Sequence, residues 1–123
     1  MSGASVFIDT NIILYFLRGD SAVVEMLSDH NLTISFISEL EVLAYPSISV
    51  QEQMLIKDFL ALCSIVDMNA KIKRLIIELR KKYRLKLPDA IVAATAIYAN
   101  LPLVTADKQF GKVTELNIIL YEW

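Results

Sequence analysis

Apolar residues in this chain form short runs that alternate with longer segments of helical spacing. A short apolar run bounded by polar residues is typical of a strand that is covered on both faces. In the clearest helical segment, one apolar face recurs at Ile72, Leu75, Ile76, Leu79 and Tyr83. The strands that this pattern predicts are Ser5–Ile8, Leu32–Ile37, Ser64–Asp67, Leu103–Thr105 and Ile118–Tyr121.

Helices are predicted between these strands by capping signals and by the residues that stop them. Ser38-x-x-Glu41 and Ser49-x-x-Glu52 have the pattern of a capping box, in which a hydroxyl and an acid satisfy free backbone N–H groups. Pro88 suits the first position of an alanine-rich helix. The predicted helices cover residues 12–17, 21–30, 38–45, 49–62, 72–83 and 89–99. The alternation predicts one α/β domain over residues 1–123, with three α/β/α layers around a five-stranded parallel sheet.

Four acidic residues stand where a predicted strand passes into a helix: Asp9, Glu41, Asp89 and Asp107. In a parallel α/β sheet, the carboxyl ends of the strands and the helix N-termini share one edge, and ligands bind there. Acids far apart in the sequence are therefore expected to meet in one pocket. Clustered carboxylates raise their own pKa values unless a cation neutralises them, so the pattern predicts a divalent metal site.

Each of these acids also has an ordinary structural explanation. Asp9 and Asp107 are suited to capping a helix or turn, and Glu41 to its capping box. Asp89 stands in the first turn of a helix, where the macrodipole favours an anion. These explanations do not account for acids at four such junctions with small hydroxyl or amide neighbours. The neighbours expected to orient the carboxylates are Thr10, Asn11, Ser38 and Thr105.

The composition is that of a compact domain without a disulfide framework. Apolar residues make up 55% of the 123 positions and charged residues 21%, which argues against disorder. Cys63, the only cysteine, is expected to be a buried thiol, and His30 is the only histidine. The uncharged stretch 90–106 falls short of the ~20 apolar residues of a membrane span. Since the N-terminus lacks a signal-peptide pattern, a soluble cytoplasmic protein is expected, without a membrane partner.

Positive charge is concentrated in one segment. Residues 71–86 hold eight of the twelve basic side chains and one acid, so they carry +7 in a chain whose net charge is −2. A solvated helix face is the more common explanation of such a run. Because the run directly precedes Asp89, it is also suited to holding a phosphate backbone. The residues predicted for that role are Arg80, Lys81, Lys82, Arg84 and Lys86.

The segments that carry these acids resemble the successive motifs of PIN-domain ribonucleases. They are FIDTNIILYFL, ISFISELEVL and LPDAIVAATAIYANLPLVTADKQF, in order and at ordinary spacing over nearly the whole chain. Each motif alone is weak, but their combination is specific. At this length the chain looks most like the stand-alone VapC-type toxins of type II toxin–antitoxin pairs. The resemblance implies cleavage of RNA with Mg²⁺ or Mn²⁺, a cognate antitoxin protein and a homodimer.

The resemblance also implies roles for the four acids. Asp9 and Glu41 match the first and second metal-binding acids, and Asp89 matches the acid that opens the alanine-rich helix. Asp107 matches the acid of the T-x-D motif. We expect Asp9 and Asp89 to be direct metal ligands, and Asp107 to bind directly or through water. Glu41 is expected to be a ligand or to position the attacking water.

Two further polar residues match the family, and two positions depart from it. Thr105 and Asn11 match residues that hold the acids together. Gln109 stands where many relatives have a further acid, which weakens the expectation of a second metal ion. Tyr45–Pro46 stands where many relatives have a glycine, which concerns the turn after the second acid.

Three other functions compete with this hypothesis. A receiver domain also has a magnesium site on a parallel sheet, and Asp67 would be its phosphoacceptor, but the chain lacks its paired acids after strand one and its lysine after strand five. A haloacid-dehalogenase phosphatase needs an acid where Asn11 stands. A PIN fold retained only for RNA or protein binding is the non-enzymatic alternative, and a metal-dependent cleavage assay separates it from a nuclease.

Overall fold

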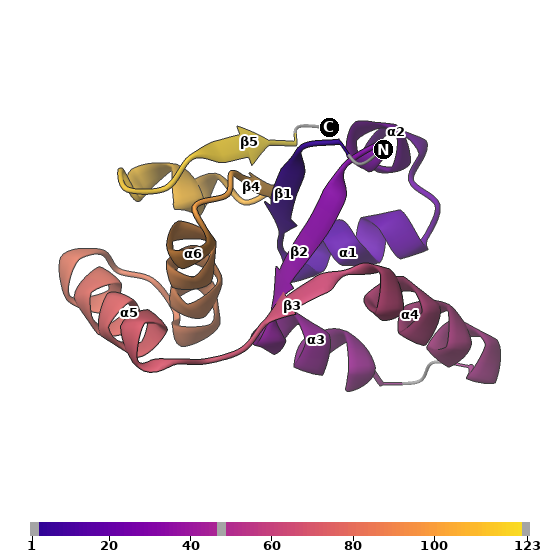
Figure 1. Cartoon of the computed structure of the whole chain (residues 1–123), viewed down its shortest axis with the longest axis horizontal. Helices are drawn as coiled ribbons and strands as arrows, with labels where there is room; N and C mark the ends of the chain where they lie inside the picture. Colours follow the sequence, from indigo (N-terminus) through magenta and orange to yellow (C-terminus); the bar gives the residue numbers. More distant parts are fainter. Residues whose placement is uncertain (1–2, 47–48, 122–123) are drawn as a thin grey trace.

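The computed structural model describes residues 3–46 and 49–121, which form a parallel sheet with helices on both faces (Figure 1). The strands are β1 (Ser5–Ile8), β2 (Asn31–Ser35), β3 (Ser64–Val66), β4 (Leu103–Thr105) and β5 (Ile118–Leu120). Their order is β3-β2-β1-β4-β5, and each neighbouring pair is parallel. The predicted fold class is therefore confirmed.

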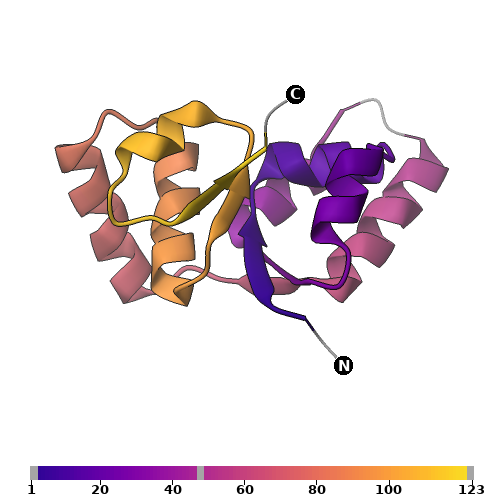
Figure 2. The same cartoon turned by 90° about the horizontal axis from the view of Figure 1, so that it is seen from above.

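The helices cover the two faces of this sheet. They are α1 (Thr10–Leu17), α2 (Ser21–Leu27), α3 (Phe36–Leu43), α4 (Val50–Leu62), α5 (Ala70–Lys82), α6 (Leu87–Ala99) and the 3-10 helix η1 (Lys108–Lys112). Figure 2 shows α5 and α6 on one side of the strands and α1, α2 and α4 on the other. Because strand side chains alternate, Phe7 and Leu103 join the core under α5 and α6, whereas Ile8 and Val104 join the other core.

Several helix starts follow from their capping residues. Ser49 and Glu52 form the predicted capping box: Glu52 N–H donates to Ser49 Oγ at 3.1 Å, and Ser49 N–H donates to Glu52 Oε1 at 3.3 Å. Asn69 caps α5 by accepting the N–H of Ile72 at 2.9 Å. α6 begins at Leu87, two residues before the predicted range, so Pro88 occupies its second position rather than its first, and its missing N–H is still tolerated there.

The predicted capping box at Ser38 is wrong. β2 ends at Ser35, and Ser35 caps α3 by accepting the N–H of Ile37 at 3.1 Å. Two serines three positions apart were both suited to the cap. The half-buried side chains of Phe36 and Ile37 pack on the core as the first turn of α3, not as the end of a strand. Glu41 is therefore free of the capping role.

Two smaller expectations also fail. The second helix ends at Leu27 rather than His30, because Asp29 adopts a left-handed backbone conformation with φ of 64° that an α-helix does not accept. Cys63 is half-buried rather than buried, since it follows the last turn of α4. Partial desolvation raises the pKa of its thiol to about 11.

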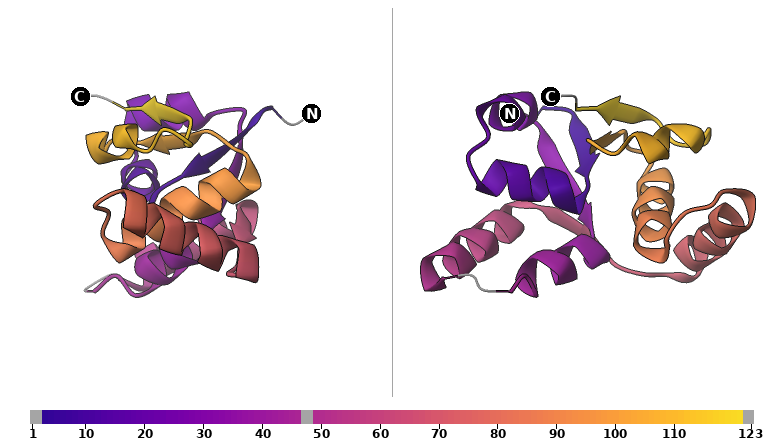
Figure 3. Two further views of the ribbon diagram at one scale, coloured as in Figure 1. Left: turned by 90° about the vertical axis from the view of Figure 1, so that its left-hand side faces the viewer. Right: turned by 180° about the vertical axis from the view of Figure 1, so that it is seen from behind.

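β1 occupies the centre of the sheet, and its two neighbours come from different halves of the chain. It pairs with β2 on one side and with β4 on the other. Such a switch point in strand order opens a crevice at the carboxyl ends of the strands. α5 packs alongside α6 at one side of the molecule, as both views of Figure 3 show. None of the helices in the described ranges has the length and apolarity needed to cross a bilayer.

Candidate active site

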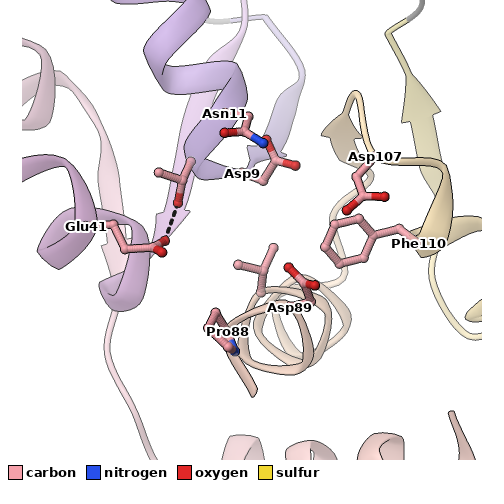
Figure 4. A pocket seen from close by; sticks show the side chains of 9 residues that line it. Asp9, Asn11, Glu41, Pro88, Asp89, Asp107 and Phe110 are labelled. Carbon is pink, nitrogen blue, oxygen red and sulfur yellow. Dashed lines mark hydrogen bonds between the residues drawn. The ribbon is translucent and has the colours of Figure 1, made fainter. Parts of the chain in front are cut away.

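The structure brings all four predicted acids to one pocket at the carboxyl ends of β1 and β4. Asp9 directly follows β1, Asp107 follows β4, Glu41 lies on α3 and Asp89 lies in the first turn of α6. In Figure 4 their side chains face a common space from four sides. The pocket has a volume of about 150 Å³ and is lined by Asp9, Thr10, Asn11, Glu41, Pro88, Asp89, Val92, Asp107 and Phe110. Their location is observed, whereas their roles in metal binding and catalysis stay predictions.

Asp9 is the most buried of these acids, with 7% of its surface exposed. Its Oδ1 accepts the N–H of Ile12 at 3.0 Å, so the capping explanation is correct for one oxygen. Its Oδ2 accepts a 2.5 Å hydrogen bond from the hydroxyl of Thr105. The same Thr105 oxygen accepts the N–H of Asp107 at 3.0 Å. Thr105 therefore holds the loops after β1 and β4 together.

Glu41 is held from across the pocket by Thr10. The hydroxyl of Thr10 donates to Glu41 Oε1 at 2.6 Å, the dashed line in Figure 4. It also lies 3.0 Å from the hydroxyl oxygen of Ser38, which is buried inside α3. Thr10 thus contacts Glu41 directly, whereas Ser38 contacts only Thr10. The role of these two residues in orienting the acid stays a prediction.

Asp107 and Asp89 are placed by helix starts. Asp107 caps η1 because its Oδ1 accepts the N–H of Gln109 at 2.9 Å, which again uses one carboxylate oxygen. Asp89 follows Pro88 in the first turn of α6, a helix whose start has no side-chain cap. The positive end of that helix therefore faces the pocket near Asp89.

Burial and mutual repulsion make two of the carboxyls hard to ionise. Burial raises the pKa of Asp9 above its ordinary value of 3.8, hydrogen bonds from Thr105 and Ile12 lower it, and the charges of Asp107 and Asp89 raise it. The net direction is upward. A cation in the pocket would reverse this trend, because an opposite charge nearby favours the ionised carboxylate.

The pKa of Asp89 is raised as well. Burial is the largest cause, and the charges of Asp107 and Glu41 add to it. Lys86 and Lys112 oppose the shift, so both lysines lie close enough to act on this carboxyl. Lys86 belongs to the predicted basic set. Lys112 does not, since it is separated from Asp89 by all of α6 and β4 and only the fold brings them together.

The oxygen donors of this pocket fit a hard divalent cation. Mg²⁺ and Mn²⁺ prefer carboxylate, hydroxyl and water oxygens. Within residues 3–46 and 49–121, no three Asp, Glu, His or Cys side chains are grouped so as to hold a metal ion by themselves. Mg²⁺ commonly binds through one or two carboxylates and keeps several waters. Two direct ligands, with the other acids acting through water, are compatible with this geometry.

The other predicted basic residues lie at the end of α5 and in the connection to α6. Arg80 and Lys81 are exposed in the last turn of α5, and Arg84 is exposed in the connection. Lys82 is paired with Glu115 at 3.2 Å on the exposed surface. Lys86 links this segment to the acids, because its positive charge lowers the pKa of Asp89. A role of these side chains in binding RNA stays a prediction.

Comparison with known families assigns the class of protein. The PIN domain family model matches residues 6–116. The chain therefore belongs to the PIN domain family. Members of this family are generally nucleases, which are hydrolases. No curated protein sequence gives a significant match.

Solved structures narrow the likeness within this family. A chain of a toxin–antitoxin complex from Klebsiella pneumoniae has a TM-score of 0.84 and 27% identity, covering 96% of this chain and 99% of that one. VapBC2 from Rickettsia felis, bound to a DNA fragment from its promoter, has a TM-score of 0.81 and 25% identity, covering 98% and 100%. VapBC-1 from nontypeable Haemophilus influenzae shares the fold, with a TM-score of 0.75 and 23% identity over 96% and 98%. The PIN domain of this protein is thus similar over its whole length to chains of VapBC and other toxin–antitoxin assemblies.

Proposed function

We propose that this protein is a metal-dependent ribonuclease that hydrolyses RNA phosphodiester bonds, as the toxin of a type II toxin–antitoxin pair. The observation that carries the proposal is the convergence of Asp9, Glu41, Asp89 and Asp107 on one pocket of a PIN domain. The raised pKa values of Asp9 and Asp89 support it: burial is the largest cause of both shifts and the charges of neighbouring acids add to them, a combination typical of functional sites.

The acids of the pocket would have two different roles, metal binding and positioning of the attacking water. Asp9 and Asp89 would hold Mg²⁺ or Mn²⁺ directly, and Asp107 directly or through water. When bound, such an ion polarises a phosphoryl oxygen and lowers the pKa of a water molecule. Glu41 is oriented by Thr10 toward the pocket, so it is suited to position the attacking water and to accept its proton.

The substrate backbone would approach from the side of α6. Lys86 precedes Pro88 and Asp89, which line the pocket, and the rest of the basic segment continues outward along α5. Phosphate contacts of this kind hold a nucleic acid without reading its sequence. Affinity for RNA is therefore expected to fall steeply as salt is raised.

The test is RNA cleavage by the purified protein in Mg²⁺ or Mn²⁺, compared with chelator and with the Asp9→Asn variant. We expect cleavage with metal, none with chelator, and none for Asp9→Asn under either condition. Asparagine also caps helices, so the variant is expected to fold. Cleavage that continues in chelator, or in Asp9→Asn, would contradict the proposal. Binding of RNA without cleavage would favour a non-catalytic binding module.

The placement of Asp67 and Asn11 argues against the receiver and phosphatase alternatives. Asp67 follows β3 but is not among the residues that line the acidic pocket, so it is not placed as a phosphoacceptor beside the other acids. Asn11 lines the pocket, and an amide there cannot take the part of the second aspartate of a phosphatase.

We also propose that an antitoxin helix covers a hollow of mixed polarity between α3 and α4. The hollow has a volume of about 230 Å³ and is lined by Leu43, Gln53, Ile56 and Lys57. Leu43 and Tyr45 are 43% and 41% exposed, so they are available to a partner. Met26 is half-buried and Leu27 is buried, so these two apolar side chains of α2 are less available to a partner. The similar structures from Klebsiella and Rickettsia are themselves toxin–antitoxin assemblies.

Leu43→Lys is expected to weaken binding of the proposed antitoxin, co-expressed with this protein, by about tenfold or more, since it places a charge in an apolar contact. Co-purification followed by titration calorimetry measures the change. Leu62→Lys is the matched control, because Leu62 is 83% exposed at the far end of α4. Equal affinities of the two variants would remove the hollow as the docking site. The homodimer stays a prediction, and light scattering of the purified protein tests it.

A further inference from the structure

A set of hydrogen bonds joins the connection before α6 to the chain after η1. The ammonium of Lys112 donates to the carbonyl oxygen of Arg84 at 3.0 Å. The phenol of Tyr83 donates to Glu115 Oε1 at 2.5 Å, and it accepts the N–H of Thr114 at 3.2 Å. We call these five residues the clasp. Its bonds all cross between segments that are far apart in the sequence.

Buried apolar residues lie next to the clasp. Between its members, Leu85 is 5% exposed and Val113 is 1% exposed, and both belong to the core under α5 and α6. Apolar contacts of this kind hold two segments together without a preferred direction. Directed hydrogen bonds above them fix the relative position more closely.

The two joined segments lead directly to two acids of the pocket. Arg84 and Leu85 run into the start of α6, where Asp89 stands, and Lys112 ends the 3-10 helix that Asp107 caps. Asp107 is also tied to Asp9 through Thr105. Asp89 comes from a helix start without a side-chain cap. The clasp is therefore the polar connection between the segment that carries Asp89 and the loop that carries Asp107.

We propose that Tyr83 and Lys112 are positioning residues that set the separation of Asp89 and Asp107. This inference rests on the proposed nuclease function, because the separation matters only if both carboxylates share a cation, directly or through water. Small errors in the placement of ligands weaken metal sites strongly, and residues that orient ligands typically contribute about 10–100-fold to metal affinity.

The test compares Tyr83→Phe, Lys112→Met and the double variant with wild type. Tyr83→Phe removes the phenol oxygen but keeps the ring, and Lys112→Met removes the donor but keeps a long side chain. Matched controls are Tyr98→Phe on the exposed face of α6 and Lys73→Met on α5, which make the same chemical changes away from the clasp. Lys112→Arg keeps a donor and serves as the rescue variant. The readouts are Mn²⁺ affinity by titration calorimetry, thermal unfolding without metal, and RNA cleavage over a series of Mn²⁺ concentrations.

We expect the double variant to bind Mn²⁺ about tenfold more weakly than wild type, with Lys112→Arg and both controls close to wild type. Cleavage by the double variant should recover at high Mn²⁺, because the acids themselves are intact. A double variant that unfolds at lower temperature but binds Mn²⁺ within about twofold of wild type would show a purely structural clasp and overturn the proposal. If wild type itself neither binds Mn²⁺ nor cleaves RNA, the nuclease function fails first, and the positioning role fails with it.

Discussion

Asp89→Asn abolishes metal-dependent cleavage of RNA and leaves the fold intact; this is the first result we expect. The substitution removes the charge of a proposed metal ligand but keeps the shape of the side chain in the first turn of α6. Loss of residues that merely orient a ligand typically costs about 10–100-fold, so loss of a direct ligand should cost at least about a hundredfold. Initial rates at saturating Mg²⁺ measure the loss, and circular dichroism checks the fold.

Asp67→Asn is the matched control, because it makes the same change at an exposed position after β3. It should cleave RNA at the rate of wild type. Unchanged cleavage by Asp89→Asn would remove Asp89 from the catalytic set. A comparable loss in Asp67→Asn would show that the effect of Asp89→Asn is not specific to the acidic pocket.

Asp89→Asn is expected to abolish cleavage but to raise the stability of the metal-free protein. The folded state raises the pKa of Asp89 above its ordinary value of 3.8, so the folded protein binds this proton more tightly than the unfolded chain does. Ionised Asp89 therefore destabilises the folded state at pH values above its raised pKa, and this cost disappears as the pH falls toward 3.8. Asp89→Asn should melt at a higher temperature than wild type at neutral pH in chelator, and the difference should shrink in acid.

Thr105→Val is expected to impair both stability and cleavage. Thr105 is fully buried, and valine has nearly its shape but neither donates to Asp9 nor accepts from Asp107. The unsatisfied groups should lower the free energy of unfolding by about 1–3 kcal/mol. Cleavage should fall by about 10–100-fold, because the Asp9 carboxylate and the backbone of Asp107 lose their common anchor. Urea unfolding and initial rates at saturating Mg²⁺ measure the two effects.

The pH dependence of Thr105→Val provides a second readout. The hydrogen bond from Thr105 lowers the pKa of Asp9, so its removal raises that pKa further. The acidic limb of the cleavage profile should therefore move to higher pH. Thr105→Ser keeps the hydroxyl and should keep the profile of wild type, although it also loses a buried methyl group. A Thr105→Val enzyme with the wild-type profile would show that Thr105 does not act through Asp9.

Much of the fold follows from local patterns in the sequence. The apolar face of α5 and the capping box at Ser49 depend on residues within one helix, so spacing alone predicts them. Acids that directly follow strands, such as Asp9, must reach the carboxyl edge of a parallel sheet wherever the helices pack. The choice between Ser35 and Ser38 as helix cap was not local, because the packing of Phe36 and Ile37 on the core decided it.

The contacts that complete the site are beyond such patterns. Thr10 and Glu41 come from different strand–helix units, and only the pairing of β1 with β2 brings them within hydrogen-bonding distance. Lys112 approaches Arg84 because η1 folds over the connection before α6. The polar side chains of the site can be identified from the sequence, whereas the packing of distant segments determines which of them are in contact.

The short helix α3 has a consequence for how such a protein can evolve. Of its eight residues, Glu41 lines the acidic pocket, and Leu43, two positions later, lines the hollow between α3 and α4. Under the proposed function, catalysis and recognition by the inhibitor are thus encoded in one turn. A lineage that escapes its inhibitor by altering this turn risks disarming its own enzyme.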